Sequence, residues 1–75
     1  MMEITKDTLL KNIMNEYPWL EEDLKKRVPM IKPLFSPLGR SLRENGTIED
    51  ISRKVGKTPE RLIEKLTEVI EEHQE

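Results

Sequence analysis

The chain of 75 residues is long enough for one domain with one hydrophobic core, and we expect that domain to span residues 1–75. Its 13 basic and 15 acidic side chains leave a net charge of −2, which argues against a dedicated nucleic-acid binder. Because the sequence contains no cysteine, it excludes disulfide bonds, thiolate zinc sites and thiol catalysis. A chain of this size without such cross-links must gain its stability from helix packing or from association.

The N-terminal residues lack the basic stretch followed by an apolar stretch that marks a secretory leader. No apolar run approaches the length that a membrane span requires. We therefore expect a cytoplasmic protein without a membrane partner.

Helical spacing of apolar residues dominates the pattern and predicts an all-α fold, a small orthogonal array of about five helices. Asp7 is the expected N-cap of the first helix, and residues 3–5 could form a very short extended segment before it. Pro18 separates the first helix from the second, because proline suits the first turn of a helix but not its interior. Tyr17 and Trp19 are expected to fill the junction between these two helices.

A proline segment over residues 28–38 interrupts the helical pattern, with Pro29, Pro33 and Pro37 at every fourth position. A regular helix cannot accommodate three such prolines, so this segment is predicted to be an extended or single-turn connector.

A short third helix should follow the prolines. Ser36 is its expected N-cap, Leu38 and Leu42 should lie on its inner face, and Gly46 should end it in the left-handed conformation.

The fourth and fifth helices have clearer end signals. Thr47 and Asp50 fit a variant of the capping box, and Gly56 should end the fourth helix. Thr58 should cap the fifth helix, on which Leu66 lies mid-stripe and is expected to be fully buried. The polar tail from about residue 71 is predicted to fray.

The region from Thr47 to Leu66 is similar to a helix-turn-helix, with small Ser52 at the expected helix crossing and Gly56 in the turn. DNA binding is therefore an alternative function. However, from residue 58 onward two basic side chains stand against six glutamates, and an acidic helix repels the phosphates it must approach. We expect no nucleic-acid partner.

The sequence presents no positioned base or nucleophile, and it predicts neither an enzyme nor a cofactor or metal site. His73 is the one histidine and is expected to be solvated in the tail. The carboxylates of the fifth helix fall on its outer side and are interpreted as a solvated surface.

Several short motifs together resemble the small bacterial and archaeal domain of unknown function (DUF) family 1858. They are residues 4–10 with Tyr17–Pro18, residues 37–40, residues 46–50 with Gly56, and residues 62–66. The resemblance implies a compact all-helical fold, found alone or appended to larger sensor or hemerythrin-like proteins. One branch carries a cysteine pair after the second helix and is named the hybrid-cluster-protein-associated redox disulfide domain.

This chain departs from that branch, because prolines and apolar residues occupy positions 28–38, where the cysteines would be sought. No redox role can be transferred to any residue here. An accessory domain of a redox or heme-sensing system that has lost its cysteines remains an alternative.

The hypothesis that we favour is a non-enzymatic interaction or regulatory module that binds a protein partner or a second copy of itself. The candidate partner-binding surface is made of Met30, Ile31, Lys32, Pro33, Leu34, Phe35 and Arg40. At least two of the four side chains of Met30, Ile31, Leu34 and Phe35 are expected to be solvent-accessible, the alternative being that they cap the core. Basic residues near this segment could add a positive surface: Lys25, Lys26, Arg27, Lys32, Arg40 and Arg43.

Overall fold

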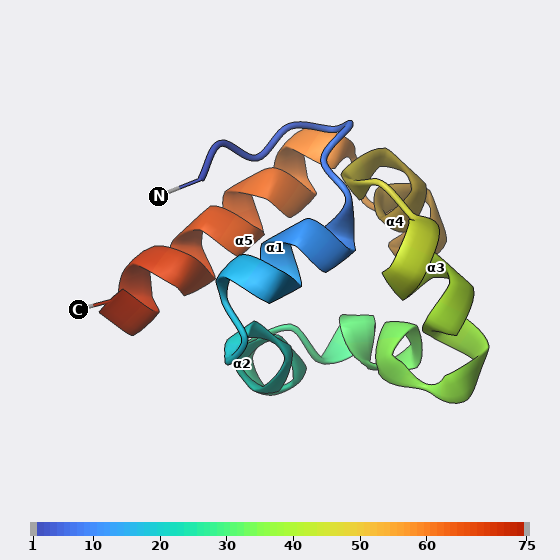
Figure 1. Cartoon of the computed structure of the whole chain (residues 1–75), viewed down its shortest axis with the longest axis horizontal. Helices are drawn as coiled ribbons and strands as arrows, with labels where there is room; N and C mark the ends of the chain where they lie inside the picture. Colours follow the sequence, from blue (N-terminus) through green and yellow to red (C-terminus); the bar gives the residue numbers. More distant parts are fainter. Residues whose placement is uncertain (1, 75) are drawn as a thin grey trace.

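The computed structural model describes residues 2–74, apart from the side chains of Met30 and Gln74, and shows an all-α globule (Figure 1). The five α-helices are α1 (Leu10–Glu16), α2 (Leu20–Arg27), α3 (Arg40–Asn45), α4 (Ile48–Val55) and α5 (Pro59–Gln74). Two 3-10 helices, η1 (Pro29–Phe35) and η2 (Pro37–Gly39), connect α2 to α3. Figure 1 shows α2 end-on below α1 and α5, which run across the view. The predicted all-α class with about five helices is confirmed.

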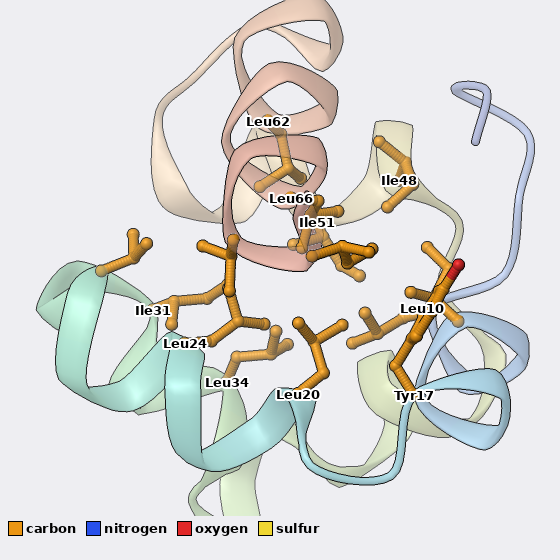
Figure 2. Close-up of a cluster of buried hydrophobic side chains, with 14 residues drawn as sticks. Leu10, Tyr17, Leu20, Leu24, Ile31, Leu34, Ile48, Ile51, Leu62 and Leu66 are labelled. Carbon is orange, nitrogen blue, oxygen red and sulfur yellow. The ribbon is translucent and has the colours of Figure 1, made fainter. Parts of the chain in front are cut away.

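One cluster of buried side chains forms the core (Figure 2). Its members come from α1, α2, α4 and α5, and also from the 3-10 helix η1. Leu66 is 1% exposed, as its mid-stripe position predicts. The buried apolar residues are Leu10, Ile13, Tyr17, Leu20, Leu24, Val28, Ile31, Leu34, Ile48, Ile51, Leu62, Leu66, Val69 and Ile70.

The start of α1 differs from the prediction, because Asp7 does not cap it. The helix begins at Leu10, and its N-cap residue is Leu9, which makes no side-chain capping hydrogen bond. The turn before the helix is closed by a hydrogen bond from the Thr8 backbone N–H to the Thr5 carbonyl at 3.1 Å. The extended pairing also lies later than residues 3–5: Leu9 forms an isolated antiparallel bridge with Thr47. The N-terminal segment is thus tied to the α3–α4 connection rather than to a cap of its own helix.

The proline segment is not extended. Residues 29–35 wind into η1, with Pro29 at its first position and Pro33 inside it. Proline is tolerated here because it fixes φ near the value that a 3-10 helix uses. In such a short helix few backbone N–H groups need a hydrogen-bond acceptor, so the N–H that proline lacks is not missed. The Ile31 N–H donates to the Val28 carbonyl at 3.0 Å, and the Ser36 N–H to the Pro33 carbonyl at 3.2 Å.

The predicted third helix is present and ends at Gly46 as predicted, but its start and the conformation of that glycine were predicted incorrectly. Ser36 precedes η2 and its hydroxyl donates to the Pro33 carbonyl at 2.7 Å instead of capping a helix. Gly46 is extended (φ −83°, ψ 142°) rather than left-handed. Glycine is still required there, because a Cβ would lie 2.5 Å from the Leu42 carbonyl oxygen. Leu38, predicted on the inner face, is 96% exposed.

The signals at α4 and α5 are confirmed. The Asp50 N–H donates to the Thr47 hydroxyl at 3.2 Å while the Thr47 N–H donates to the Asp50 carboxylate at 3.0 Å, which completes the capping box. Gly56 adopts the left-handed conformation, with φ 73°. The Thr58 hydroxyl accepts from the Arg61 N–H at 3.2 Å at the start of α5.

The C-terminal residues for which fraying is predicted are helical as far as Gln74, and their fraying stays a prediction. Helix α5 continues to Gln74, and an ion pair joins Arg27 of α2 to Glu72. His73 stacks on Trp19, while its side chain remains 43% exposed. The end of α5 is therefore held against α2.

Candidate functional site

The buried part of the proline segment is the face that carries Ile31 and Leu34, which are 2% and 3% exposed. These two of the four apolar side chains are therefore not accessible, whereas Phe35 is partly buried and the side chain of Met30 lies outside the described part of the structure. A 3-10 helix has three residues per turn, so Val28, Ile31 and Leu34 lie along one side, and that side faces the core.

The other members of the candidate surface divide between partial burial and exposure. Phe35 is partly buried against the core, and the Lys25 ammonium lies 5.5 Å from its ring centroid. Lys32, Pro33 and Arg40 are exposed. The side chain of Met30, also predicted for this surface, lies outside the described part of the structure.

A groove lies at the end of this segment, where η1, η2, α3 and α4 meet, and its volume is about 160 Å³. Most of its lining is apolar or backbone, and one basic side chain comes from α4. The lining residues are Pro33, Leu34, Ser36, Leu38, Gly39, Leu42 and Lys54.

Leu38 is the most conspicuous residue of the groove. It is 96% exposed, and no other large hydrophobic side chain among the described residues is as accessible. The sequence pattern gave no direct signal for this, because its spacing to Leu42 matches an inward-facing helical stripe. The preceding Pro37 starts the separate helix η2, and that break in register turns Leu38 outward.

The groove is held in shape by one close backbone contact and by two hydrogen bonds from the side chain of Arg43. Gly39 is buried, and a Cβ on it would lie 2.2 Å from the carbonyl oxygen of Leu34, so the two backbones touch where η1 and η2 meet. The Arg43 guanidinium donates through Nη1 to the Leu34 carbonyl at 2.8 Å and to the Ser36 carbonyl at 2.7 Å. These contacts fasten the groove wall to α3.

Four basic residues line the groove or adjoin its lining, and we call them the basic rim: Lys32, Arg40, Arg43 and Lys54. Lys54 lines the groove, and Arg43 binds the carbonyls of two lining residues. Lys32 and Arg40 are exposed and are the sequence neighbours of the lining residues Pro33 and Gly39. Arg40 forms an exposed pair with Glu44 at 3.1 Å. Two other members of the predicted positive cluster form ion pairs with residues that do not line the groove: Lys25 with Glu21 at 2.9 Å, and Arg27 with Glu72. The predicted cluster is therefore divided, and only part of it belongs to the groove.

The region from Thr47 to Leu66 does form two helices joined by a short turn, as a helix-turn-helix requires. Helix α5 packs its apolar stripe against α2 and α4. Its exposed side carries the glutamates Glu60, Glu64, Glu68, Glu71 and Glu72. This surface is negative where a DNA-reading helix needs cations.

Asp50, at the start of α4, has a pKa that its surroundings displace. The hydrogen bond from the Thr47 backbone N–H holds the pKa of this carboxyl below its ordinary value. The Thr47 hydroxyl and the Arg53 guanidinium act in the same direction. Asp50 is thus a structural helix cap that is stabilised in its ionised form.

Within residues 2–74 no three His, Asp or Glu side chains come together in a way that would hold a metal ion. None of the helices in this range combines the length and apolar character needed to cross a membrane.

Comparisons of the chain with known protein families, with curated proteins and with solved structures found no match. The resemblance to the DUF family 1858 stays a prediction.

Proposed function

We propose that this domain is a non-enzymatic protein-binding module, and that its groove takes an apolar side chain of the partner beside Leu38. The observation that carries the proposal is the position of Leu38. A single exposed leucine on a protein surface is ordinary. This one is 96% exposed and stands at a groove of about 160 Å³ that Pro33 and Leu42 also line. Such a concave apolar site can bury an anchoring side chain and gain the free energy of removing it from water.

The rigidity of the groove supports the same function. The contact of Gly39 with the Leu34 backbone and the two hydrogen bonds from Arg43 hold its walls before any partner arrives. A preformed site avoids the entropic cost of ordering a loop during binding. The same groove would serve an accessory domain of a larger assembly, without redox chemistry in this chain.

Selection from a displayed library of random peptides tests the proposal. Peptides are selected on the wild-type domain, and their affinities are then measured for Leu38→Ser and for Glu64→Ser, a matched change at an exposed position of α5. We expect Leu38→Ser to weaken binding by about tenfold, since the loss of one buried leucine contact removes roughly 1.4 kcal/mol or more. Glu64→Ser should have no effect.

Amide chemical shifts of the wild-type domain should change around Leu38, Gly39 and Leu42 when a selected peptide is added. The proposal is wrong if no peptide is selected, or if the selected peptides bind Leu38→Ser as tightly as the wild type.

A further inference from the structure

The charges of this chain are distributed unevenly along the sequence. Residues 24–43 contain six basic side chains and no acidic one, although the whole chain has a net charge of −2. These residues include the end of α2, both 3-10 helices and the start of α3. The segment that builds most of the groove is therefore strongly positive in a chain that is negative overall.

Within the described residues, Lys32 and Lys54 have no carboxylate at ion-pair distance. Arg43 binds two backbone carbonyls, which orient its guanidinium but do not neutralise its charge. Three of the four members of the basic rim thus keep a positive charge that no carboxylate within the described residues offsets.

The carboxylates closest in sequence to the rim are already engaged or exposed. The pair between Arg40 and Glu44 has side chains 74% and 58% exposed, so it contributes little and can be exchanged for another partner. On α4, Glu49 and Asp50 lie 3.2 and 3.8 Å from the Arg53 guanidinium. They leave Lys54 free on the groove side.

We infer that the partner segment is acidic: a stretch of another protein in which an aliphatic or aromatic anchor is flanked by aspartate or glutamate. This inference rests on the proposed function and specifies the partner. The anchor would enter the groove beside Leu38, and the flanking carboxylates would face Lys32 and Lys54, which lie on η1 and α4. Complementary charges around an apolar anchor fix the register of a bound peptide and speed its association.

Nucleic acid fits the same site less well. Phosphates would meet the basic rim, but binding of single strands also relies on exposed aromatic rings on which the bases stack. Phe35, the aromatic residue of this region, is partly buried against the core under Lys25. The groove itself presents aliphatic side chains.

A second copy of this chain also fits less well. Its acidic surface is the outer side of α5, whose C-terminal part lies at the opposite end of the molecule from η2 in Figure 1. The apolar residues Leu62, Leu66 and Val69 of that helix are buried in the core. A second copy would offer carboxylates without an accessible anchor between them.

The test uses the full chain and the tightest peptide from the random library. That peptide is synthesised as selected, with its acidic residues changed to the corresponding amides, and with them changed to lysine. Affinities are measured for the wild-type domain, for the double variant Lys32→Glu/Lys54→Glu, and for the control Lys6→Glu/Lys11→Glu. The control has the same change in net charge at exposed positions outside the groove. Thermal melting confirms that each variant is folded.

We expect selected peptides to be enriched in aspartate and glutamate, and the rim double variant to bind them at least about tenfold more weakly. The control should change the affinity by less than about twofold, because exposed charges beyond the Debye length are screened. The lysine version should bind the rim double variant more tightly than it binds the wild type.

Different failures have different meanings. Peptides that depend on Leu38 but are neutral, or that bind the rim double variant unchanged, overturn the acidic partner and leave the binding function standing. Absence of any Leu38-dependent peptide overturns both. Tighter binding of a random oligonucleotide than of any peptide, or a Leu38-dependent dimer in sedimentation, replaces the acidic segment by nucleic acid or by a second copy.

Discussion

The imidazole of His73 lies flat against the indole of Trp19, with ring centroids 3.6 Å apart and an angle of 11° between the ring planes. Its Nδ1 is 3.1 Å from the Oδ2 of Asp23, a contact between residues 50 positions apart in the sequence. The preceding residue on α5, Glu72, pairs with Arg27. The last turn of α5 is therefore in contact with residues at both ends of α2.

His73→Ala should lower the free energy of unfolding by about 0.5–1.5 kcal/mol, the usual contribution of a stacked aromatic pair. It should also expose Trp19 further and shift its fluorescence emission to longer wavelength. The measurement is denaturant unfolding followed by Trp19 fluorescence, with Glu71→Ala as the control, since Glu71 is exposed in the same turn. An unchanged emission spectrum for His73→Ala would mean that the rings are not stacked in solution.

Much of the fold follows from signals within a few residues of each other. The capping box of Thr47 and Asp50, the left-handed Gly56 and the buried Leu66 could all be predicted, because each depends on local backbone geometry or on the period of one helix. Contacts between distant segments left no such signal. The stacking of His73 on Trp19 requires knowing where α5 lies relative to α2.

The candidate site could be predicted less well, because the spacing of the prolines in residues 28–38 does not match the period of the helix that they form. Prolines at every fourth residue suggest a broken or extended chain, whereas the structure uses the three-residue period of a 3-10 helix. That period buries Ile31 and Leu34 and leaves Lys32 and Pro33 outside. The groove depends in addition on Lys54, which comes from α4 and shares no sequence pattern with the prolines.

The stability contributed by Asp50 should depend on pH. Since its pKa in the folded state is held below the ordinary value, its contribution is fully present above the unfolded-state pKa and is lost as the pH falls through the lower folded-state pKa. Asp50→Asn should therefore be less stable than the wild type near neutral pH, and the difference should shrink below about pH 4. Urea unfolding of both proteins across this range measures it. A difference that stays constant with pH would contradict the role of the ionised carboxylate.

Gly39→Ala should destabilise the domain more than Gly56→Ala. A Cβ at position 39 would lie 2.2 Å from the Leu34 carbonyl oxygen, and two backbones would have to separate, at a cost of roughly 1–3 kcal/mol or more. At Gly56 the space is open and the cost is the left-handed conformation, about 1–2 kcal/mol. Thermal and urea unfolding compare the two variants. The opposite order would mean that η1 and η2 do not touch at Gly39.

Leu34 and Leu38 are both leucines and are four residues apart, but replacement by alanine should destabilise the protein strongly at Leu34 and hardly at all at Leu38. Leu34 is 3% exposed and packs in the core, so Leu34→Ala should cost roughly 2–5 kcal/mol in the free energy of unfolding. Leu38 is 96% exposed, so Leu38→Ala should change stability by less than about 0.5 kcal/mol. Urea unfolding of the two variants and the wild type, without any ligand, measures both values. Equal losses would place Leu38 inside the protein and remove the exposed leucine on which the proposed binding function depends.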